Sequence, residues 1–298
     1  MKLGIVTVLY HSDEVLPGFF RSLTGEPVGF ARKLYVIDNS PSSSGTEMAQ
    51  ALSLKYGIDA EFVFNNANLG VAKGNNQGID LALQDGCSHV LLANNDTEFS
   101  DDTIRRLIET LAGGAERVAT PKIMYYDDPT LLWYGGGHIN AWTMRTPHYG
   151  IKTIDRGQFD RLEYVGYAPT CFMMLDAQVF QSVGRMDEQF FVYYDDTDFV
   201  WRMAARGIRI RYVPNSVVLH KVSTSTGGDR SPFTLYYTNR NRIYFIRKNL
   251  TGLQRVFALS YLLLTRLPRL CLLPRNLARR SWRGVIDGFG MKIPKELA

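Results

Sequence analysis

Short apolar runs and helix-type patterns alternate along the first third of the chain. Runs rich in Val, Ile and Leu, typical of buried strands, occupy Leu3–Leu9, Lys33–Ile37, Ala60–Asn65 and His89–Ala93. Stretches with helical spacing of apolar positions follow them at Glu14–Leu23, Thr46–Tyr56, Gly70–Leu83 and Asp101–Leu111. Strands and helices in turn at this spacing predict an α/β fold with a Rossmann-like, doubly wound and mainly parallel sheet.

The second part of the chain has a different pattern. Residues Tyr125–Tyr164 are rich in Gly, Tyr, Trp and Asp, with Trp133-Tyr134-Gly135-Gly136-Gly137 at the centre. After them we expect further strands at Ala168–Leu175 and Arg209–Val213, with a helix from about Asp196 to Ala205 between them. From Leu235 onward the pattern is helical, with interruptions expected at Pro268 and Pro274.

Polar residues follow each of the first four predicted strands. They are Tyr10-His11, Asp38-Asn39, Asn65-Asn66 and Asn94-Asn95-Asp96. The carboxyl ends of parallel strands meet at one edge of a sheet, where α/β proteins bind their ligands. Each pair alone is typical of a turn, but four of them at one edge predict a binding cleft.

Three groups of residues in the chain are candidates for chemistry. A carboxylate at Asp96, after a buried strand, suits a divalent ion held against a diphosphate, although such clusters are commonly turns. The run Tyr193-Tyr194-Asp195-Asp196-Thr197-Asp198 holds three acids, which indicates either an acidic helix start or a general base. His220 precedes the Ser/Thr/Gly loop at 223–228, so it is either structural or part of a metal site beneath a lid.

Several classes of protein are disfavoured by what the sequence lacks. It has no Gly-x-Gly-x-x-Gly after the first strand, no phosphate-loop motif and no Gly-x-Ser-x-Gly elbow. The missing glycine fingerprint counts against a nucleotide-binding oxidoreductase. Cys87, Cys171 and Cys271 are widely spaced, which predicts small core residues and a reducing cytosol. The N-terminus lacks the cleavage site of a signal peptide and is better interpreted as a first strand.

In this order, the motifs resemble those of the family 2 inverting glycosyltransferases, which have the GT-A fold. Val6–Tyr10 is similar to the family's opening strand, Val36–Ser40 to its second strand, and Asn68–Asn75 to the loop and helix beside the nucleotide. Asn94-Asn95-Asp96 stands where the family has Asp-x-Asp, and Phe191–Asp198 resembles its Glu-Asp-x-Asp segment. The resemblance covers roughly residues 3–250 and is strongest to rhamnosyltransferase-like members, which build bacterial surface polysaccharides such as O-antigen.

The resemblance implies a role for each matching residue. The expected nucleotide-sugar contacts are Thr7, Leu9, Tyr10, Asp38, Asn68, Gly70, Lys73, Asn75, Asn94 and Asn95. Asp96 and His220 would hold a divalent cation, Mg²⁺ or Mn²⁺. Asp196 would be the base, with Asp195 in place of the family's Glu. The acceptor contacts would be Asp198, Gly136, Gly137 and Trp201.

The resemblance also implies a domain plan and a reaction. Residues 1–230 would form the catalytic domain, with a nucleotide-sugar half at about 1–100 and an acceptor half at about 101–230, and 231–298 a basic helical extension. The reaction would be a metal-dependent, inverting transfer, with rhamnose from dTDP-rhamnose as the first choice of donor. UDP-hexose and UDP-galactofuranose remain alternative donors, and a nucleotidyltransferase with a similar cleft is a neighbouring alternative. The acceptor would be a glycan, either free or linked to a polyprenyl lipid.

Charge is distributed unevenly along the chain. Residues 240–298 contain thirteen Lys or Arg and two acids, a net charge of +11 in a chain of +5, so residues 1–239 carry −6. Apolar residues interleaved with arginines in Leu253–Leu273 indicate a helix in a membrane interface, at the inner face of the cell membrane. A helical cap over the core and a homodimer contact are the alternatives. Nucleic-acid binding by this tail is disfavoured, because it leaves the polar sheet edge and the acidic cluster unexplained.

Overall fold

The computed structural model describes residues 1–25, 30–161, 163–222 and 231–294. The chain divides into two compact units. Unit 1 contains Met1–His138, His148–Phe191 and Asp195–Val222, and unit 2 contains Ile139–Pro147, Val192–Tyr194 and the described residues from 231 on. Two short segments from the middle of the chain, Ile139–Pro147 and Val192–Tyr194, thus belong to unit 2 together with the C-terminal helices. The expected lid at 223–228 lies outside the described residues.

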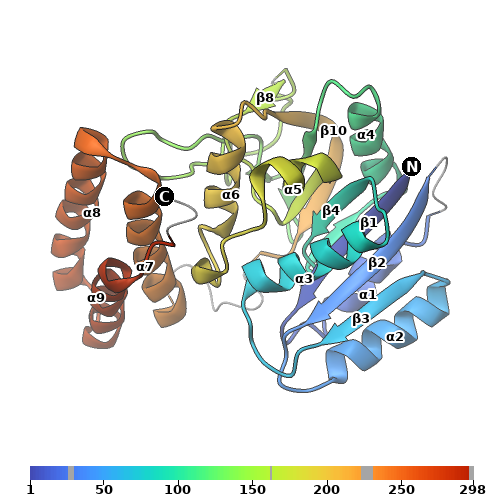
Figure 1. Cartoon of the computed structure of the whole chain (residues 1–298), viewed down its shortest axis with the longest axis horizontal. Coiled ribbons are helices and arrows are strands. Elements are labelled where there is room, and N and C mark those ends of the chain that lie inside the picture. The colour runs from blue at the N-terminus through green and yellow to red at the C-terminus, as the bar shows by residue number, and fades with distance from the viewer. Residues whose placement is uncertain (26–29, 162, 223–230, 295–298) are drawn as a thin grey trace. The chain divides into compact units, whose positions relative to one another are not determined.

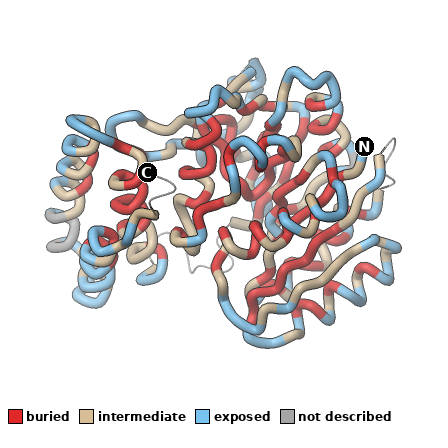
Figure 2. Tube along the Cα trace, viewed as in Figure 1, coloured by how far each residue is buried: buried red, intermediate tan, exposed pale blue. Residues whose placement is uncertain are grey.

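The first four long strands of unit 1 form the parallel part of its sheet. They are β1 (Lys2–Leu9), β2 (Ala31–Asp38), β3 (Ala60–Phe64) and β4 (His89–Ala93), in the order β3-β2-β1-β4. Leu9 pairs with Asp38 and Asp38 with Phe64, so the strands end together and their following loops share one edge (Figure 1). Figure 2 shows buried residues concentrated along β1, β2 and β4, whereas the residues of β3 are half-buried or exposed. The predicted doubly wound α/β fold is confirmed here.

The sheet continues beyond β4 in a mixed arrangement. Its further strands are β9 (Phe172–Asp176), β6 (Val118–Tyr125), β10 (Ile210–His220) and β5 (Thr97–Phe99), with β7 (Leu132–Tyr134) beside β6 and β8 (Tyr164–Val165) beside β10. Of the pairings between these strands, β6 with β10 is parallel; β9 is antiparallel to both β4 and β6. The expectation of a mainly parallel sheet therefore holds for the N-terminal strands, and the sheet as a whole is mixed.

Strand β6 was not predicted, and Pro121 explains why. A proline inside an apolar run argues against a central strand, because it cannot donate to the ladder. In the structure the register with β10 shifts just after the Val213–Pro121 pair, so the proline lies at an irregularity in the ladder. The strand is nevertheless buried along almost its whole length.

Helices cover the sheet of unit 1. They are α1 (Leu16–Ser22), α2 (Ser44–Tyr56), α3 (Val71–Gln84), α4 (Asp101–Ala112), α5 (Ala177–Val183), the short helix η1 (Glu188–Phe190) and α6 (Asp195–Ala204). Helix α3 packs closely on β1 because it presents glycines there. A Cβ on Gly74 would lie 2.8 Å from the side chain of Val8, and one on Gly78 would lie 2.3 Å from that of Val6. Cys87 and Cys171 are buried and free, as predicted.

Unit 2 is built from α7 (Pro232–Asn249), α8 (Gly252–Leu272) and α9 (Arg275–Gly290). Gly284 and Gly288 of α9 again allow close packing, since a Cβ at either would lie within 2.6 Å of the α7 backbone. Pro274 caps α9, but the expected interruption at Pro268 is wrong, because that proline lies inside α8. Among the described residues, no helix is long and apolar enough to cross a bilayer.

Candidate active site

Asp96 and His220 lie side by side at the end of the sheet. Strand β5 runs antiparallel to the end of β10 with Thr97 opposite His220, which brings Asp96 next to the histidine. Asp96 Oδ1 is 3.2 Å from His220 Nε2, and both side chains are largely buried. Burial raises the pKa of Asp96, but the contact with His220 and the nearby charge of Lys221 together outweigh it, so the pKa is lowered. Asp96 is therefore an anion at neutral pH.

This pair fits a divalent cation. Asp96 Oδ1 and His220 Nδ1 are buried, and among the described residues neither has a partner with hydrogen-bond geometry. Two neighbouring ligands of an octahedral ion, each at about 2.1 Å, are about 3.0 Å apart, close to the observed separation. No cluster of three or more His, Cys, Asp or Glu side chains suited to a metal occurs in the described part of the chain. A cation here would take its remaining ligands from phosphate and water, as Mg²⁺ commonly does.

The two asparagines before Asp96 have different surroundings. Asn95 is buried, and its side-chain amide donates to the Val8 carbonyl at 2.5 Å, which ties the ends of β4 and β1 together. Asn94 is exposed and is held by its backbone, whose N–H donates to the Cys171 carbonyl at 2.8 Å. The side chain of Asn94 thus faces solvent at the carboxyl edge of the sheet.

Asp195 and Asp196 begin α6, directly after a strained turn. Tyr193 and Tyr194 have φ of 63° and 68°, a conformation that costs non-glycine residues energy and is concentrated at functional sites. The carboxylate of half-buried Asp196 is held at both oxygens. Tyr167 donates its hydroxyl to Oδ2 at 2.5 Å, and the Thr197 N–H donates to Oδ1 at 2.6 Å.

The surroundings of Asp195 and Asp196 differ in how well they stabilise the ionised carboxylate. Burial, and then the charge of Asp196, raise the pKa of Asp195. Burial also raises the pKa of Asp196 overall, although the hydrogen bonds from Tyr167 and Thr197 oppose this shift and stabilise the ionised form. Because those bonds fix and stabilise the Asp196 carboxylate, it is the better placed of the two to accept a proton.

Aromatic side chains from residues 133–167 surround both parts of this site. The Trp133 ring packs edge-on against His220, with centroids 4.6 Å apart, and against His148 at 4.7 Å. His148 in turn stacks on Tyr167 at 5.8 Å. The Tyr167 backbone is fixed as well, because Tyr134 donates its hydroxyl to the Tyr167 carbonyl at 2.7 Å. One chain of rings therefore links the metal-type pair with the partner of Asp196.

Cys171 is a buried thiol whose pKa is raised by both carboxylates. Burial raises the pKa of this thiol well above its ordinary value, and the charges of Asp96 and Asp196 raise it further. Both acids therefore lie near the same buried sulfur. The sequence pattern indicated only a core residue here.

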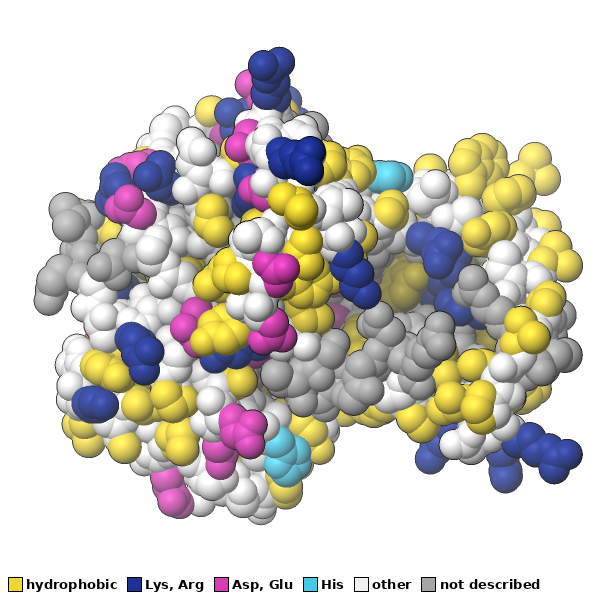
Figure 3. Space-filling model, turned by 180° about the vertical axis from the view of Figure 1, so that it is seen from behind, with side chains coloured by type: hydrophobic (Ala, Val, Ile, Leu, Met, Phe, Trp, Pro, Cys, Tyr) yellow, Lys and Arg dark blue, Asp and Glu magenta, His cyan; other side chains and the backbone are white. Residues whose placement is uncertain are grey.

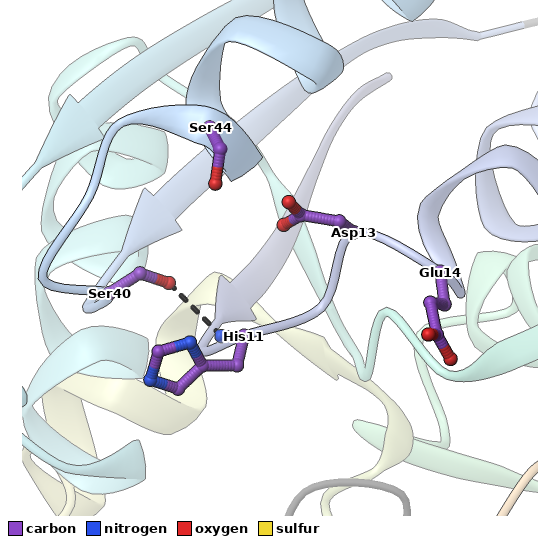
Figure 4. Close-up of a pocket in the computed structure, with 5 residues that line it drawn as sticks. All are labelled: His11, Asp13, Glu14, Ser40 and Ser44. Atoms are coloured by element: carbon purple, nitrogen blue, oxygen red, sulfur yellow. Dashed lines mark hydrogen bonds between the residues drawn. The ribbon is translucent and has the colours of Figure 1, made fainter.

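The loops after β1 and β2 form a polar pocket of about 230 Å³, lined by His11, Asp13, Glu14, Ser40 and Ser44 (Figure 4). The Ser40 hydroxyl accepts a hydrogen bond from the His11 N–H at 3.1 Å, which joins the two loops.

Asp38, Thr7, Leu9 and Tyr10 lie near this pocket in the chain but differ in exposure. Asp38 is fully buried and accepts from the Ser40 N–H and the Thr46 hydroxyl, each at 2.8 Å, so it shapes the loop. Thr7 and Leu9 are buried in β1, and the Thr7 hydroxyl has no hydrogen-bond partner in the described chain. Tyr10 is half-buried at the end of β1.

The loop before α3 and the first turns of that helix contain the other residues expected at the nucleotide. Gly70 has φ of 85° and passes so close to Phe191 that a Cβ would lie 2.6 Å from its carbonyl oxygen. Exposed Asn68 accepts from the Gly70 N–H at 3.1 Å. Lys73 is half-exposed, 3.9 Å from Glu188, and Asn75 is buried against the sulfur of Met186. Lys73 is thus a cation in the first turn of α3 that solvent reaches.

The residues expected to hold the acceptor are mostly structural. Asp198 is fully buried and pairs with Arg202 at 2.8 Å, and that arginine also donates to the carbonyls of Val183 and Arg185. Gly136 and Gly137 are buried, and the Gly137 carbonyl accepts from the Tyr167 N–H at 3.1 Å. Trp201 is half-buried on α6. The structure therefore favours a supporting role for Asp198 and the glycines.

Sequence reasoning missed Tyr167, Trp133 and His148 as parts of the site. The Trp-Tyr-Gly-Gly-Gly run is a signal for Trp133 alone, and no motif marks His148 or Tyr167. Their contacts depend on pairing between distant segments, such as the bridge of Gly137 with His148. No periodicity in the sequence encodes that pairing.

Solved structures resemble this chain in fold. The structure of GalNAc-T7 with UDP, GalNAc and Mn²⁺ superposes with a TM-score of 0.67 at 14% identity, over 95% of this chain and 54% of that one. The chain therefore spans about half the length of that neighbour. A mannosyltransferase of Pyrobaculum calidifontis in complex with GDP-Man and Mn²⁺ superposes with a TM-score of 0.59 at 11% identity, over 98% of this chain and 76% of that one. The fold is of the GT-A type.

Curated relatives and a family model match the sequence itself. The low-salt glycan biosynthesis hexosyltransferase Agl10 of Haloferax volcanii is 26% identical over 80% of this chain and 74% of the relative. The dTDP-rhamnosyl transferase RfbF of Shigella flexneri is 26% identical over 61% of each chain. An N-acetylglucosaminyl-diphospho-decaprenol L-rhamnosyltransferase of Mycobacterium tuberculosis is 26% identical over 76% of this chain and 78% of the relative. The model of glycosyl transferase family 2 matches residues 4–184, more than half of the sequence, and the chain belongs to this family.

Proposed function

We propose that the protein transfers one sugar from a nucleotide-sugar to a carbohydrate acceptor with inversion at the anomeric carbon. The observation that carries this proposal is the pairing of a metal-type Asp–His couple with a separate, hydrogen-bonded aspartate in one site. The rings of Trp133, His148 and Tyr167 connect the two parts, because Trp133 packs against His220 and Tyr167 donates to Asp196.

In this proposal Asp196 is the general base. It takes the proton of the acceptor hydroxyl as that oxygen bonds to the anomeric carbon, and the bond from this carbon to the diphosphate oxygen breaks. The nucleoside diphosphate leaves with the bonding electron pair. Because one displacement completes the reaction, no covalent nucleophile is needed and the configuration inverts. Tyr167 and Thr197 hold Asp196 in position, because the Tyr167 hydroxyl donates to Oδ2 and the Thr197 N–H donates to Oδ1.

Asp96 and His220 would hold a divalent cation, Mg²⁺ or Mn²⁺. When bound, that cation supplies positive charge, which stabilises the leaving diphosphate. Two structural neighbours contain Mn²⁺, which supports the choice of a divalent ion. The pocket at His11 and Ser40 and the loop at Gly70 would receive the nucleoside part of the donor.

Rhamnose from dTDP-rhamnose is the proposed donor, and UDP-hexose or UDP-galactofuranose the alternative. Two relatives are named as rhamnosyl transferases, which supports the first choice. The proposed acceptor is a glycan on a polyprenyl lipid, and the relative from M. tuberculosis is named for such an acceptor. The proposed place of action is the inner face of the cell membrane, in the synthesis of a surface polysaccharide such as O-antigen.

Release of nucleotide from a panel of dTDP-, UDP- and GDP-sugars tests the proposal. We expect one donor to be hydrolysed slowly without acceptor, with water in place of the hydroxyl, and only when Mg²⁺ or Mn²⁺ is present. Chelation with EDTA should abolish release, and added metal should restore it. If no donor binds or turns over, even with lipid-linked acceptors supplied, the proposed activity is wrong.

A further inference from the structure

Helix α8 of unit 2 presents an apolar face that the described chain leaves uncovered. Its exposed apolar residues recur at helical spacing and are Leu253, Val256, Phe257, Leu264 and Leu272. Leu253 and Leu272 are 86% and 83% exposed, far more than core leucines such as Leu262 at 0%. At 1.5 Å per residue this face is about 28 Å long. Several uncovered apolar side chains along one helix are typical of a binding surface.

Two further elements of unit 2 also expose apolar side chains, and one of them packs directly against α8. Trp142, from the segment Ile139–Pro147, is 57% exposed and packs edge-on against Phe257 with ring centroids 5.4 Å apart. Gln254 fastens that segment to α8, since its amide donates to the Ala141 carbonyl at 2.6 Å. Helix α9 exposes Trp282, at 41%, with Ile286 and Phe289. We call all these exposed apolar side chains of α8, α9 and Trp142 the docking face.

Basic side chains accompany the docking face, and almost no acid balances them. Exposed arginines on α9 are Arg275, Arg279, Arg280 and Arg283, and α8 contains no Asp or Glu. The acid of α9, Asp287, is already paired with Arg283 at 3.0 Å. Figure 3 shows hydrophobic side chains with Lys and Arg close by over the C-terminal helices.

We propose that the docking face binds the surface of a membrane that contains anionic lipids. Tryptophan and arginine beside aliphatic residues suit the interface, where rings and stems enter the acyl boundary while charges meet headgroups. Charge complementarity favours lipid over a second copy of the chain, because two such faces would bring like charges together. The inference rests on the proposed function for the acceptor, but the binding itself does not require catalysis.

The test is co-sedimentation of the full-length protein with phosphatidylcholine vesicles, with and without phosphatidylglycerol. The variant Leu253→Gln/Leu264→Gln removes apolar contacts, and Arg275→Gln/Arg279→Gln/Arg280→Gln removes charge. The matched control is Leu54→Gln on α2 of unit 1, a leucine that is likewise 86% exposed. Thermal melting of each variant checks folding, and donor hydrolysis in solution is measured in parallel.

We expect the native protein and the control to bind phosphatidylglycerol vesicles, and to bind less at high salt. The leucine variant should bind at least tenfold more weakly, a fold-change in line with losing leucine burial. The arginine variant should lose the preference for anionic vesicles. Solution hydrolysis should stay unchanged in all of them, so failure of catalysis and failure of docking are separate results. Vesicle binding that is absent, or equal in all variants, overturns the proposal, as does a dimer that the leucine variant splits without any vesicle binding.

Discussion

At the scale of single residues, the roles proposed for Asp96, His220, Tyr167 and Asp196 rest on the few atoms around each. The Asp–His couple leaves buried atoms without hydrogen-bond partners, whereas both oxygens of Asp196 are engaged. The Asp96–His220 couple suits a divalent cation that binds together with the donor. The arrangement at Asp196 suits a base whose position and charge are fixed in advance.

Tyr167 is the positioning residue of the site, and Tyr167→Phe tests this. Its hydroxyl lowers the pKa of Asp196, so removing it should raise that pKa. A base must be ionised, and activity falls as pH drops through its pKa. We therefore expect the acid limb of the pH profile of kcat to move to higher pH by about 1–2 units, from a charged hydrogen bond of about 1.5–3 kcal/mol. An unshifted limb, even with lower kcat, would reduce Tyr167 to a packing role.

His220→Ala should weaken use of the metal. Loss of one of the two protein ligands should raise the Mn²⁺ concentration for half-maximal donor hydrolysis at least tenfold, with partial recovery at saturating metal. The check is a metal titration of nucleotide release, together with a melting curve to show that the variant folds. An unchanged half-saturation concentration would leave His220 as a structural neighbour of Trp133.

At the scale of elements, the fit of α3 on β1 carries a stability prediction. Gly78→Ala would place a Cβ 2.3 Å from Val6, in the parallel part of the sheet that lies next to the site. We expect a loss of about 1–3 kcal/mol in the free energy of unfolding by denaturant, as for other overpacked cores. The control is Gly113→Ala at the end of α4, where the added methyl meets nothing within 4 Å and φ is −72°. Equal stability of the two variants would contradict the close packing.

Sequence periodicity predicted the elements whose pattern is recognisable within one short segment and missed those that depend on distant partners. The strands β1 to β4 are apolar runs between helical patterns, so each was recognisable by itself. Strand β6 was not, because Pro121 interrupts its pattern and only the irregular pairing with β10 accommodates it. Pro268 shows the opposite error, since a proline that usually breaks a helix lies inside α8.

The candidate site was predictable only in part, for the same reason. Asp96 and Asp196 stand out because acids follow a buried strand or begin a helix. Asp198 matches the same motif but is fully buried in its ion pair with Arg202, which no motif distinguishes from a binding role. Tyr167 lies in a loop without pattern, and its role is visible only when its hydroxyl meets Asp196.

At the scale of the whole molecule, the candidate active site and the basic, apolar helices belong to different parts of the chain. The residues of the candidate site lie in unit 1, and the basic, apolar helices lie in unit 2. Transfer to a lipid-linked acceptor would use both, one for the reaction and one for the membrane. Each is open to its own test, since hydrolysis needs no vesicle and vesicle binding needs no donor.

The central claim is that Asp196 is the base of a sugar transfer. The most direct measurement compares donor hydrolysis by the native protein, Asp196→Asn and Asp195→Asn, with donor affinity measured alongside. We predict that Asp196→Asn lowers kcat by about 10²–10⁴-fold, the usual contribution of a general base, while the Kd of the donor stays the same. Asp195→Asn should cost clearly less. Equal turnover by native protein and Asp196→Asn, or a larger loss in Asp195→Asn, would contradict the account.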